Sequence, residues 1–192
     1  SNPTVLSIHQ EAGEEYIWIG TDGGGINRFD PSTYEFTHYP STKKAKVVSI
    51  APYSKDELAI SIHADRIWLF NKNTGTLRAL DIKDEEVNYK IAYSGTNINL
   101  HREPSGSMLL ISSMVRRLNT NTLTCSKIAI SDGKKSQGNI SIIGQTTQGL
   151  WMHDNSSIDL LADGESQMHR ITTCDNNKIN SGHIGPDGIM WM

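Results

Sequence analysis

The sequence predicts an all-β chain built from repeated units of four short strands. Short apolar cores recur along the 192 residues at intervals of about 41, 50, 42 and 40 residues. Turns rich in Gly, Pro, Asn, Asp and Ser flank each core, and these residues supply the fixed or positive φ values that tight turns need. No apolar run keeps a helical period for as many as about ten residues, because turn residues interrupt it.

Each unit is expected to run through four strands in the same order, beginning with a strand of small and apolar residues. These first strands are 5–10, 47–52, 97–102, 139–145 and 181–185. The apolar anchor strands follow at 16–21, 57–61, 108–112, 149–153 and 188–192. The third strands are 26–30, 67–71, 115–119 and 158–163, and the last strands are 35–39, 76–80, 123–128 and 167–171.

Four strands at a period of 40 to 45 residues are typical of a β-propeller blade. The repeat units span about 3–40, 46–81, 96–129 and 138–173, with a partial unit at 180–192. This gives about four and a half blades of four antiparallel strands, and we expect an open partial propeller. The apolar faces of its terminal blades are expected to drive self-association.

Several side chains are assigned by their place in the repeat. The alternation of the first strands predicts burial of five residues: Ile8, Ile50, Leu100, Ile142 and Ile184. Trp18, Trp151 and Trp191 share one repeat position, which indicates packing between blades, whereas Trp68 has polar counterparts and is a candidate for a ligand or subunit contact. Because outer strands of neighbouring blades are expected to splay apart, Cys125 and Cys174 are predicted not to form a disulfide.

The first unit, 14-EEYIWIGTDGGGINRFDPSTYEFTHY-39, resembles the two-component regulator propeller repeat, and 185-GPDGIMWM-192 repeats its opening half. The second and third units depart from the family pattern, with Ala59 and Leu109 or Leu110 where the family prefers Trp. The resemblance implies the periplasmic sensor region of a hybrid two-component regulator. It also implies an oligosaccharide as the ligand.

The glycines of 20-GTDGGG-25 raise the alternative of a phosphate-binding loop. Such a loop needs a following helix, whose N-terminus faces the anion, and here a strand is expected to follow. The other units manage the corresponding turn without a glycine cluster. The glycines are therefore interpreted as a hairpin turn that requires positive φ.

Candidate ligand-binding residues lie on the loops that join the second and third strands and on those that join successive units, since loops on a rigid scaffold carry function. The segment 81–97 is the longest of these loops, and it places two tyrosines near carboxylates, a combination that suits a sugar. The alternative is a solvated loop whose tyrosines pack on the next unit. The candidates are Asp22, His63, Arg66, Trp68, Tyr89, Tyr93, His153 and Asp154.

No local motif predicts catalysis or a cofactor, and neither the seven histidines nor the two cysteines show metal-ligand spacing. With 18 basic and 21 acidic residues, the chain has no basic stripe for nucleic acid, and no apolar run is long enough to span a membrane. Two other functions stay open. One is a propeller lyase or glycosidase using His63, His153 and Asp154, and the other is a structural dimerisation scaffold. The start at Ser1-Asn2 and the stop within a second strand suggest a fragment of a longer protein.

Overall fold

The computed structural model describes residues 4–87, 97–173 and 178–192, and it confirms the all-β prediction. The strands of the first part are β1 (Val5–His9), β2 (Ile17–Thr21), β3 (Gly25–Asp30), β4 (Glu35–His38), β5 (Val47–Pro52), β6 (Glu57–Ile62), β7 (Ile67–Asn71), β8 (Leu77–Ala79) and β9 (Asn99–Arg102). Those of the second part are β10 (Met108–Ile111), β11 (Val115–Asn119), β12 (Thr124–Ile130), β13 (Ser141–Thr146), β14 (Gly149–His153), β15 (Ser157–Leu161), β16 (Gln167–Thr173), β17 (His183–Ile184) and β18 (Met190–Trp191). The described helical residues are a 3-10 turn η1 (Pro40–Thr42) and residues 85–87, and no helix among them is both long and apolar enough to cross a membrane.

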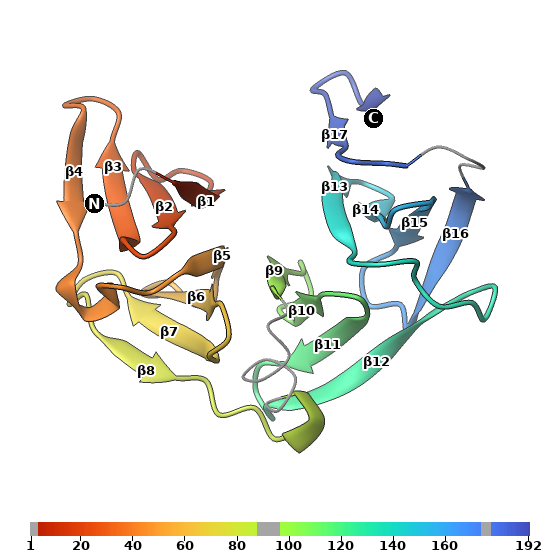
Figure 1. Ribbon diagram of the computed structural model, residues 1–192, viewed down its shortest axis with the longest axis horizontal. Helices are drawn as coiled ribbons and strands as arrows, with labels where there is room; N and C mark the ends of the chain where they lie inside the picture. The colour runs from red at the N-terminus through yellow and green to blue at the C-terminus, as the bar shows by residue number, and fades with distance from the viewer. Residues whose placement is uncertain (1–3, 88–96, 174–177) are drawn as a thin grey trace. The chain divides into compact units, whose positions relative to one another are not determined.

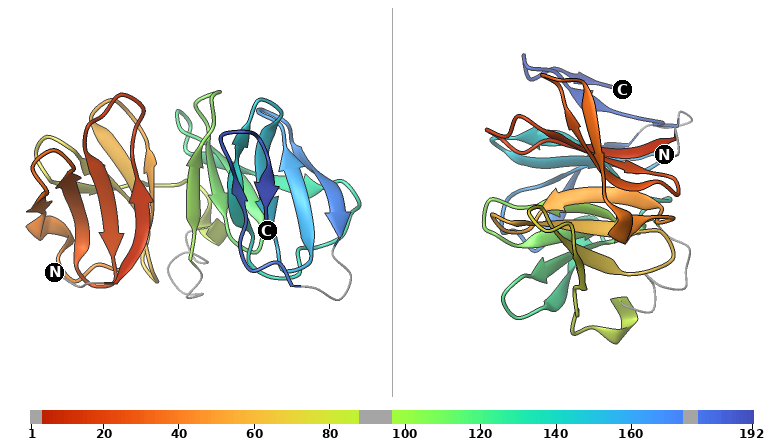
Figure 2. Two further views of the ribbon diagram at one scale, coloured as in Figure 1. Left: turned by 90° about the horizontal axis from the view of Figure 1, so that it is seen from above. Right: turned by 90° about the vertical axis from the view of Figure 1, so that its left-hand side faces the viewer.

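The chain divides into two compact units, Ser1–Arg102 (unit 1) and Glu103–Met192 (unit 2). Unit 1 holds two antiparallel four-stranded sheets, ordered β1-β2-β3-β4 and β5-β6-β7-β8, and strand β9 (Figure 1). In unit 2 the strands follow the order β13-β14-β15-β16-β12-β11-β10, with a separate β17-β18 hairpin. Figure 2 shows the blue strands of unit 2 running side by side. The sheets have the architecture of β-propeller blades.

A repeated turn fixes the step from the third strand to the fourth. In each of three sheets an Asp or Asn ends the third strand, and its side-chain oxygen accepts backbone N–H groups two and three residues later. These residues are Asp30, Asn71 and Asn119. The fourth residue after each has positive φ, which Gly75 adopts without a Cβ penalty, whereas Tyr34 and Leu123 adopt it at a steric cost.

The core of unit 1 lies between its two four-stranded sheets. Trp18 is 2% exposed, and its ring meets Phe70 edge-on at a centroid distance of 5.7 Å and lies 5.9 Å from Tyr39. Val47 and Ile50 complete this cluster from β5. The prediction that Trp18 packs between successive sheets is therefore confirmed.

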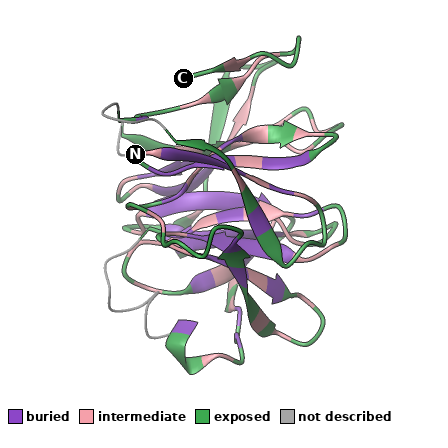
Figure 3. Cartoon of the chain, turned by 90° about the vertical axis from the view of Figure 1, so that its right-hand side faces the viewer, coloured by how far each residue is buried: buried purple, intermediate pink, exposed green. Residues whose placement is uncertain are grey.

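Burial of the first strands follows the prediction only in part. Ile50 and Leu100 are buried, Ile142 and Ile184 are half-buried, and Ile8 is 69% exposed. The prediction is wrong for Ile8 because no second sheet packs on its face of β1–β4 within the described residues. Figure 3 colours the chain by burial and shows buried and exposed segments within the strands.

The anchor tryptophans of unit 2 differ from Trp18 in the same way. Trp151 is half-buried and packs on a small cluster with Ile143, Ile158 and Ile179. Trp191 lies on the short β17-β18 hairpin and is 62% exposed, which contradicts the expected burial at this repeat position. The physical reason is again the lack of a sheet on its outer side among the described residues.

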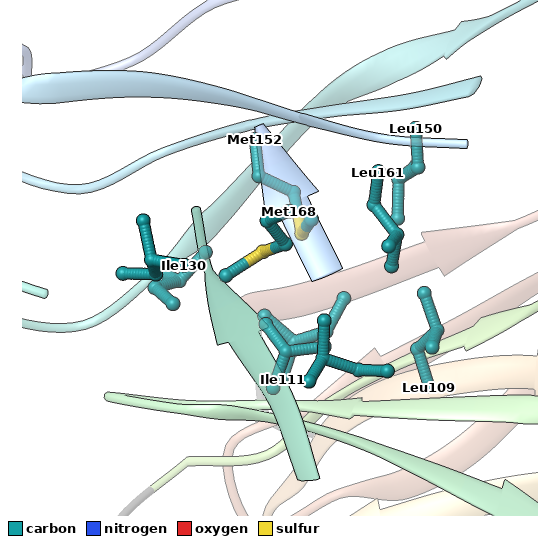
Figure 4. Packing of buried hydrophobic residues seen from close by; sticks show 10 residues of the cluster. Leu109, Ile111, Ile130, Leu150, Met152, Leu161 and Met168 are labelled. Atoms are coloured by element: carbon teal, nitrogen blue, oxygen red, sulfur yellow. The ribbon is translucent and has the colours of Figure 1, made fainter. Parts of the chain in front are cut away.

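The expectation that outer strands splay apart is wrong in unit 2, where β12 and β16 pair in parallel through Ala129 with Gln167 and Ile130 with Met168. Both strands have seven residues, and Ile130 and Met168 belong to one buried cluster, which holds the strand ends within pairing distance. Figure 4 shows this cluster from close by. Cys125 is half-buried on β12 and is not part of a disulfide, while Cys174 lies outside the described residues.

Candidate functional site

The glycine turn between β2 and β3 uses its N–H groups within the fold. Gly23 and Gly25 both donate to the carbonyl oxygen of Ala45, each at 3.1 Å, and Ile26 N–H donates to Thr42 Oγ1 at 3.0 Å. Both glycines have positive φ, and a Cβ on Gly25 would collide with Thr42. With β3 following directly, the turn holds the β4–β5 connection against the first sheet and lacks the following helix that a phosphate-binding loop uses.

Two of the predicted candidates of unit 1, Asp22 and His63, lie along one set of contacts that starts at this turn. Lys46 Nζ lies 3.3 Å from Asp22 Oδ2, and the Lys46 carbonyl accepts the backbone N–H of His63 at 2.9 Å. His63 Nδ1 lies 2.8 Å from Asn97 Oδ1. Asp22, Lys46 and His63 are all half-buried, so the structure brings two predicted candidates together through a lysine that the sequence reading did not include.

Arg66 and Trp68 lie at the turn that follows His63. The Trp68 indole N–H donates to Asp65 Oδ2 at 3.0 Å, and the Arg66 guanidinium lies 5.7 Å from the Trp68 ring centroid. Arg66 is exposed, whereas Trp68 is half-buried and also packs on the core of unit 1. An aromatic ring, a cation and carboxylates are thus available at one end of unit 1, a combination that can both stack on and hydrogen-bond a hydroxylated ligand. We call Asp22, Lys46, His63, Asp65, Arg66 and Trp68 the unit 1 polar surface.

The two candidates of unit 2, His153 and Asp154, are buried, and they form hydrogen bonds to backbone groups of nearby turns. His153 Nδ1 lies 2.9 Å from the carbonyl oxygen of Asp154. Asp154 accepts the backbone N–H groups of Gln137, Ser156 and Ser157 at 2.7 to 2.8 Å. Burial raises the pKa of Asp154, but these hydrogen bonds outweigh it and lower the pKa to about 2. A ligand at this position would have to compete with the bonds that shape the turn.

A charge network around the buried Asp159 of unit 2 was not predicted. Asp159 Oδ1 accepts Arg170 Nε at 3.1 Å, and Arg170 Nη1 lies 3.0 Å from Asp132. Burial raises the pKa of Asp159, and the guanidinium opposes that shift. The sequence feature that could have predicted this network is the aspartate inside the apolar strand 157-SIDLL-161, because a buried carboxylate needs a charged or hydrogen-bonding partner.

The remaining candidates, Tyr89 and Tyr93, lie outside the described residues. Within residues 4–87, 97–173 and 178–192 no group of three His, Cys, Asp or Glu side chains is placed to hold a metal ion.

Comparison with known proteins identifies solved structures that share this fold. No family model and no curated protein matches the chain. The structure is similar to the extracellular domain of the hybrid two-component system BT4673 from B. thetaiotaomicron, with a TM-score of 0.70, 16% identity, and coverage of 97% of this chain and 24% of that one. It is also similar to the extracellular domain of the hybrid two-component system BT3049 from the same organism. The TM-score is 0.64 and the sequence identity 18%, with coverage of 92% of this chain and 23% of that one.

A third similar structure, the WD40 repeats of RRP9, has a TM-score of 0.66 at 10% identity over 94% of this chain and 54% of that one. The chain therefore spans about a quarter of the length of the two-component domains. The likeness confirms that the fold is that of these extracellular domains, as the repeat implied, and at such identities it concerns the fold alone.

Proposed function

We propose that this chain is part of the ligand-sensing propeller of an extracytoplasmic two-component regulator, and that it acts by binding rather than by catalysis. The observation that carries the proposal is the fold, shared over 97% of the chain with a sensor's extracellular domain. We also propose a periplasmic location and a membrane-anchored parent, which the same likeness supports.

The proposed ligand is an oligosaccharide, and the unit 1 polar surface supports it. Arg66 and Asp22 offer a donor and an acceptor, and Trp68 offers an aromatic edge at the same end of the sheets. Sugars require both kinds of contact, because their hydroxyls need hydrogen-bond partners and their C–H faces stack on aromatic rings. Tyr89 and Tyr93, which the sequence predicts as ligand contacts, are included in the proposed site.

A glycan panel titrated by calorimetry tests this proposal. We expect at least one oligosaccharide to bind, and Arg66→Ala with Asp22→Asn to weaken it by about tenfold, the effect of losing one or two hydrogen bonds to a ligand. Lys43→Gln with Lys44→Gln is the matched control, since both lysines are exposed on the β4–β5 connection outside the polar surface. Product formation from any glycan would favour the enzyme instead.

A specific observation favours self-association as a second property. The exposed large apolar side chains of the described residues lie in the first sheet and its turns and in the last strands: Val5, Leu6, Ile8, Tyr34, Phe36, Ile171, Ile189, Trp191 and Met192. We propose that the face of β1–β4 bearing Ile8 and Phe36 takes another sheet of the same kind, from a second copy in solution, as expected for an open partial propeller of about four and a half blades.

Light scattering over a range of concentrations tests this second proposal. The chain is expected to associate as its concentration rises, and Ile8→Lys is expected to shift it toward the monomer because a buried ammonium opposes sheet packing. Lys55→Glu, an exposed change on the β5–β6 turn, serves as the control. A strictly monomeric wild-type chain would contradict the proposal without affecting glycan binding.

A further inference from the structure

Unit 2 contains a pocket of about 440 Å³ whose lining includes none of the residues assigned above to ligand sensing. Its lining comes from the β10–β11 turn, β11, β12, β16 and the β12–β13 connection, and it includes the apolar residues Met114, Ile128, Ile130, Ile140 and Met168. Pockets of 300 to 1,000 Å³ with apolar walls and a few polar groups are the usual form of small-molecule sites.

Part of the pocket is open because neither Ile128 on β12 nor the β12–β13 connection fills it with a large aromatic side chain. At the corresponding place in unit 1, Tyr39 follows β4 and packs on Trp18 and Phe70, at 5.9 and 4.8 Å between ring centroids. Counted from the turn residues Asp30 and Asn119, which end the third strands, Ile128 of unit 2 stands at the place of Tyr39. Ile128 is smaller than a tyrosine and lines the pocket, and the connection 131-SDGKKSQGN-139 adds no aromatic residue, so part of the space that a tyrosine fills in unit 1 is open in unit 2.

The connection is held at both ends and passes along the pocket between them. Asp132 is paired with Arg170 at 3.0 Å near one end. Gln137 donates its backbone N–H to Asp154 and accepts the Asn155 side-chain amide at 3.0 Å at the other. The segment between these anchor points, residues 133–136, lines the pocket.

Two lysines give the pocket a positive rim. Lys134 and Lys135 line it and are exposed, and neither has an ion-pair partner among the residues that the structure describes. The nearest acidic residue along the connection, Asp132, is already paired with Arg170. Ser113 adds a hydroxyl group that can donate a hydrogen bond, whereas the Ser136 hydroxyl already donates to the carbonyl oxygen of Gly138 at 2.8 Å.

We propose that this pocket binds a small amphipathic carboxylate, with an apolar chain against Met114, Ile130 and Met168 and a carboxylate at Lys134 and Lys135. The apolar lining removes the chain from water, which is favourable in proportion to the area buried. The two ammonium groups select an anionic head over a neutral one of the same size. This site is separate from the unit 1 polar surface and does not depend on the sensor function.

Titration of the 15N-labelled 192-residue chain with octanoate, followed by NMR, tests the proposal, with octanamide as the neutral compound of equal length. Octanoate is expected to shift the amide signals of residues 113–115 and 128–136 saturably, in the millimolar range typical of so small a ligand. It is expected to bind about tenfold more tightly than octanamide, since two exposed lysines each contribute a few-fold. Raising the salt concentration should narrow this difference.

Variants assign the contacts. Lys134→Gln with Lys135→Gln should reduce octanoate binding to the octanamide level, while the matched pair Lys43→Gln with Lys44→Gln should leave it unchanged. Met114→Gln, a half-buried position, should weaken both compounds. Equal binding of the two compounds, shifts confined to β1–β4, or no effect of the Lys134 and Lys135 changes would overturn the proposal.

Discussion

The two sheets of unit 1 have the same strand order and pairing pattern, yet they differ in what covers them. Val5 and Ile8 on β1 occupy the register positions of Val47 and Ile50 on β5, and in both strands the register shifts at the same place, after the first residue. Ile50 is 7% exposed and Ile8 is 69% exposed. Burial of a first-strand residue is therefore decided by the sheet packed against it and not by its own strand.

The largest expected effect is at the centre of the covered interface. Trp18→Ala is expected to destabilise the chain by about 3–5 kcal/mol, because it removes a buried ring that packs on both Tyr39 and Phe70. Urea unfolding with far-UV circular dichroism measures this loss. Trp191→Ala, at the same repeat position but 62% exposed, should change stability by less than about 0.5 kcal/mol.

The comparison itself is tested by truncating the two equivalent isoleucines. Ile50→Ala should cost about 2–4 kcal/mol and Ile8→Ala less than about 0.5 kcal/mol, measured under dilute conditions where copies do not associate. Similar costs would mean that Ile8 is covered in solution, and a second copy on β1–β4 would be the first explanation to examine.

A charged bridge between the two sheets should make their association depend on pH. Lys72 Nζ, after β7, lies 2.7 Å from Glu14 Oε1 and 3.0 Å from Glu11 Oε2, both in the β1–β2 turn. Burial raises the pKa of Glu14, but its hydrogen bonds to Lys72 and Trp18 outweigh burial, so the pKa of Glu14 is lowered. Burial lowers the pKa of Lys72, but the two glutamates outweigh burial, so the pKa of Lys72 is raised.

The bridge therefore stabilises the fold above the ordinary glutamate pKa and below the ordinary lysine pKa, and it is lost as the pH falls through the lowered value for Glu14. Lys72→Met should cost about 1–2 kcal/mol at pH 7 because these side chains are only partly exposed, and less near pH 3. Unfolding curves at several pH values measure both quantities. A cost that is constant between pH 3 and 7 would argue against the bridge.

The smallest expected effect concerns one turn position. Gly23 and Ala64 occupy equivalent places between the second and third strands of the two sheets, with φ of 84° and 53°. Ala64→Gly should stabilise the chain by roughly 0.5–1 kcal/mol because glycine accepts positive φ without a Cβ penalty, and Gly23→Ala should destabilise it by a similar amount. Thermal unfolding compares the two, and a loss of stability in Ala64→Gly would show that the alanine methyl has a packing role.

The repeat could be predicted from sequence because strand length and turn chemistry are local. The Asp and Asn turns, the anchor strands and the glycine hairpin all follow from neighbouring residues. Exposure of Ile8, the bridge from Lys72 and the pairing of β12 with β16 depend on residues far away in the chain, and no local pattern encodes them. For the same reason His63 and Asp22 could be placed on loops, while the Lys46 contacts that join them could not.

The parallel pairing of β12 with β16 has a consequence for how the chain resists forming fibrils. An unpaired outer edge of a long strand is a template on which another chain can add. β12 and β16, each of seven residues, occupy each other's edges over part of their length, and β8 at the edge of its sheet has only three residues. Strand β4 is also short, with four residues, but it carries the exposed Phe36 and pairs with no strand on its outer edge among the described residues, so we expect intermolecular strand addition to begin there rather than at β12 or β16.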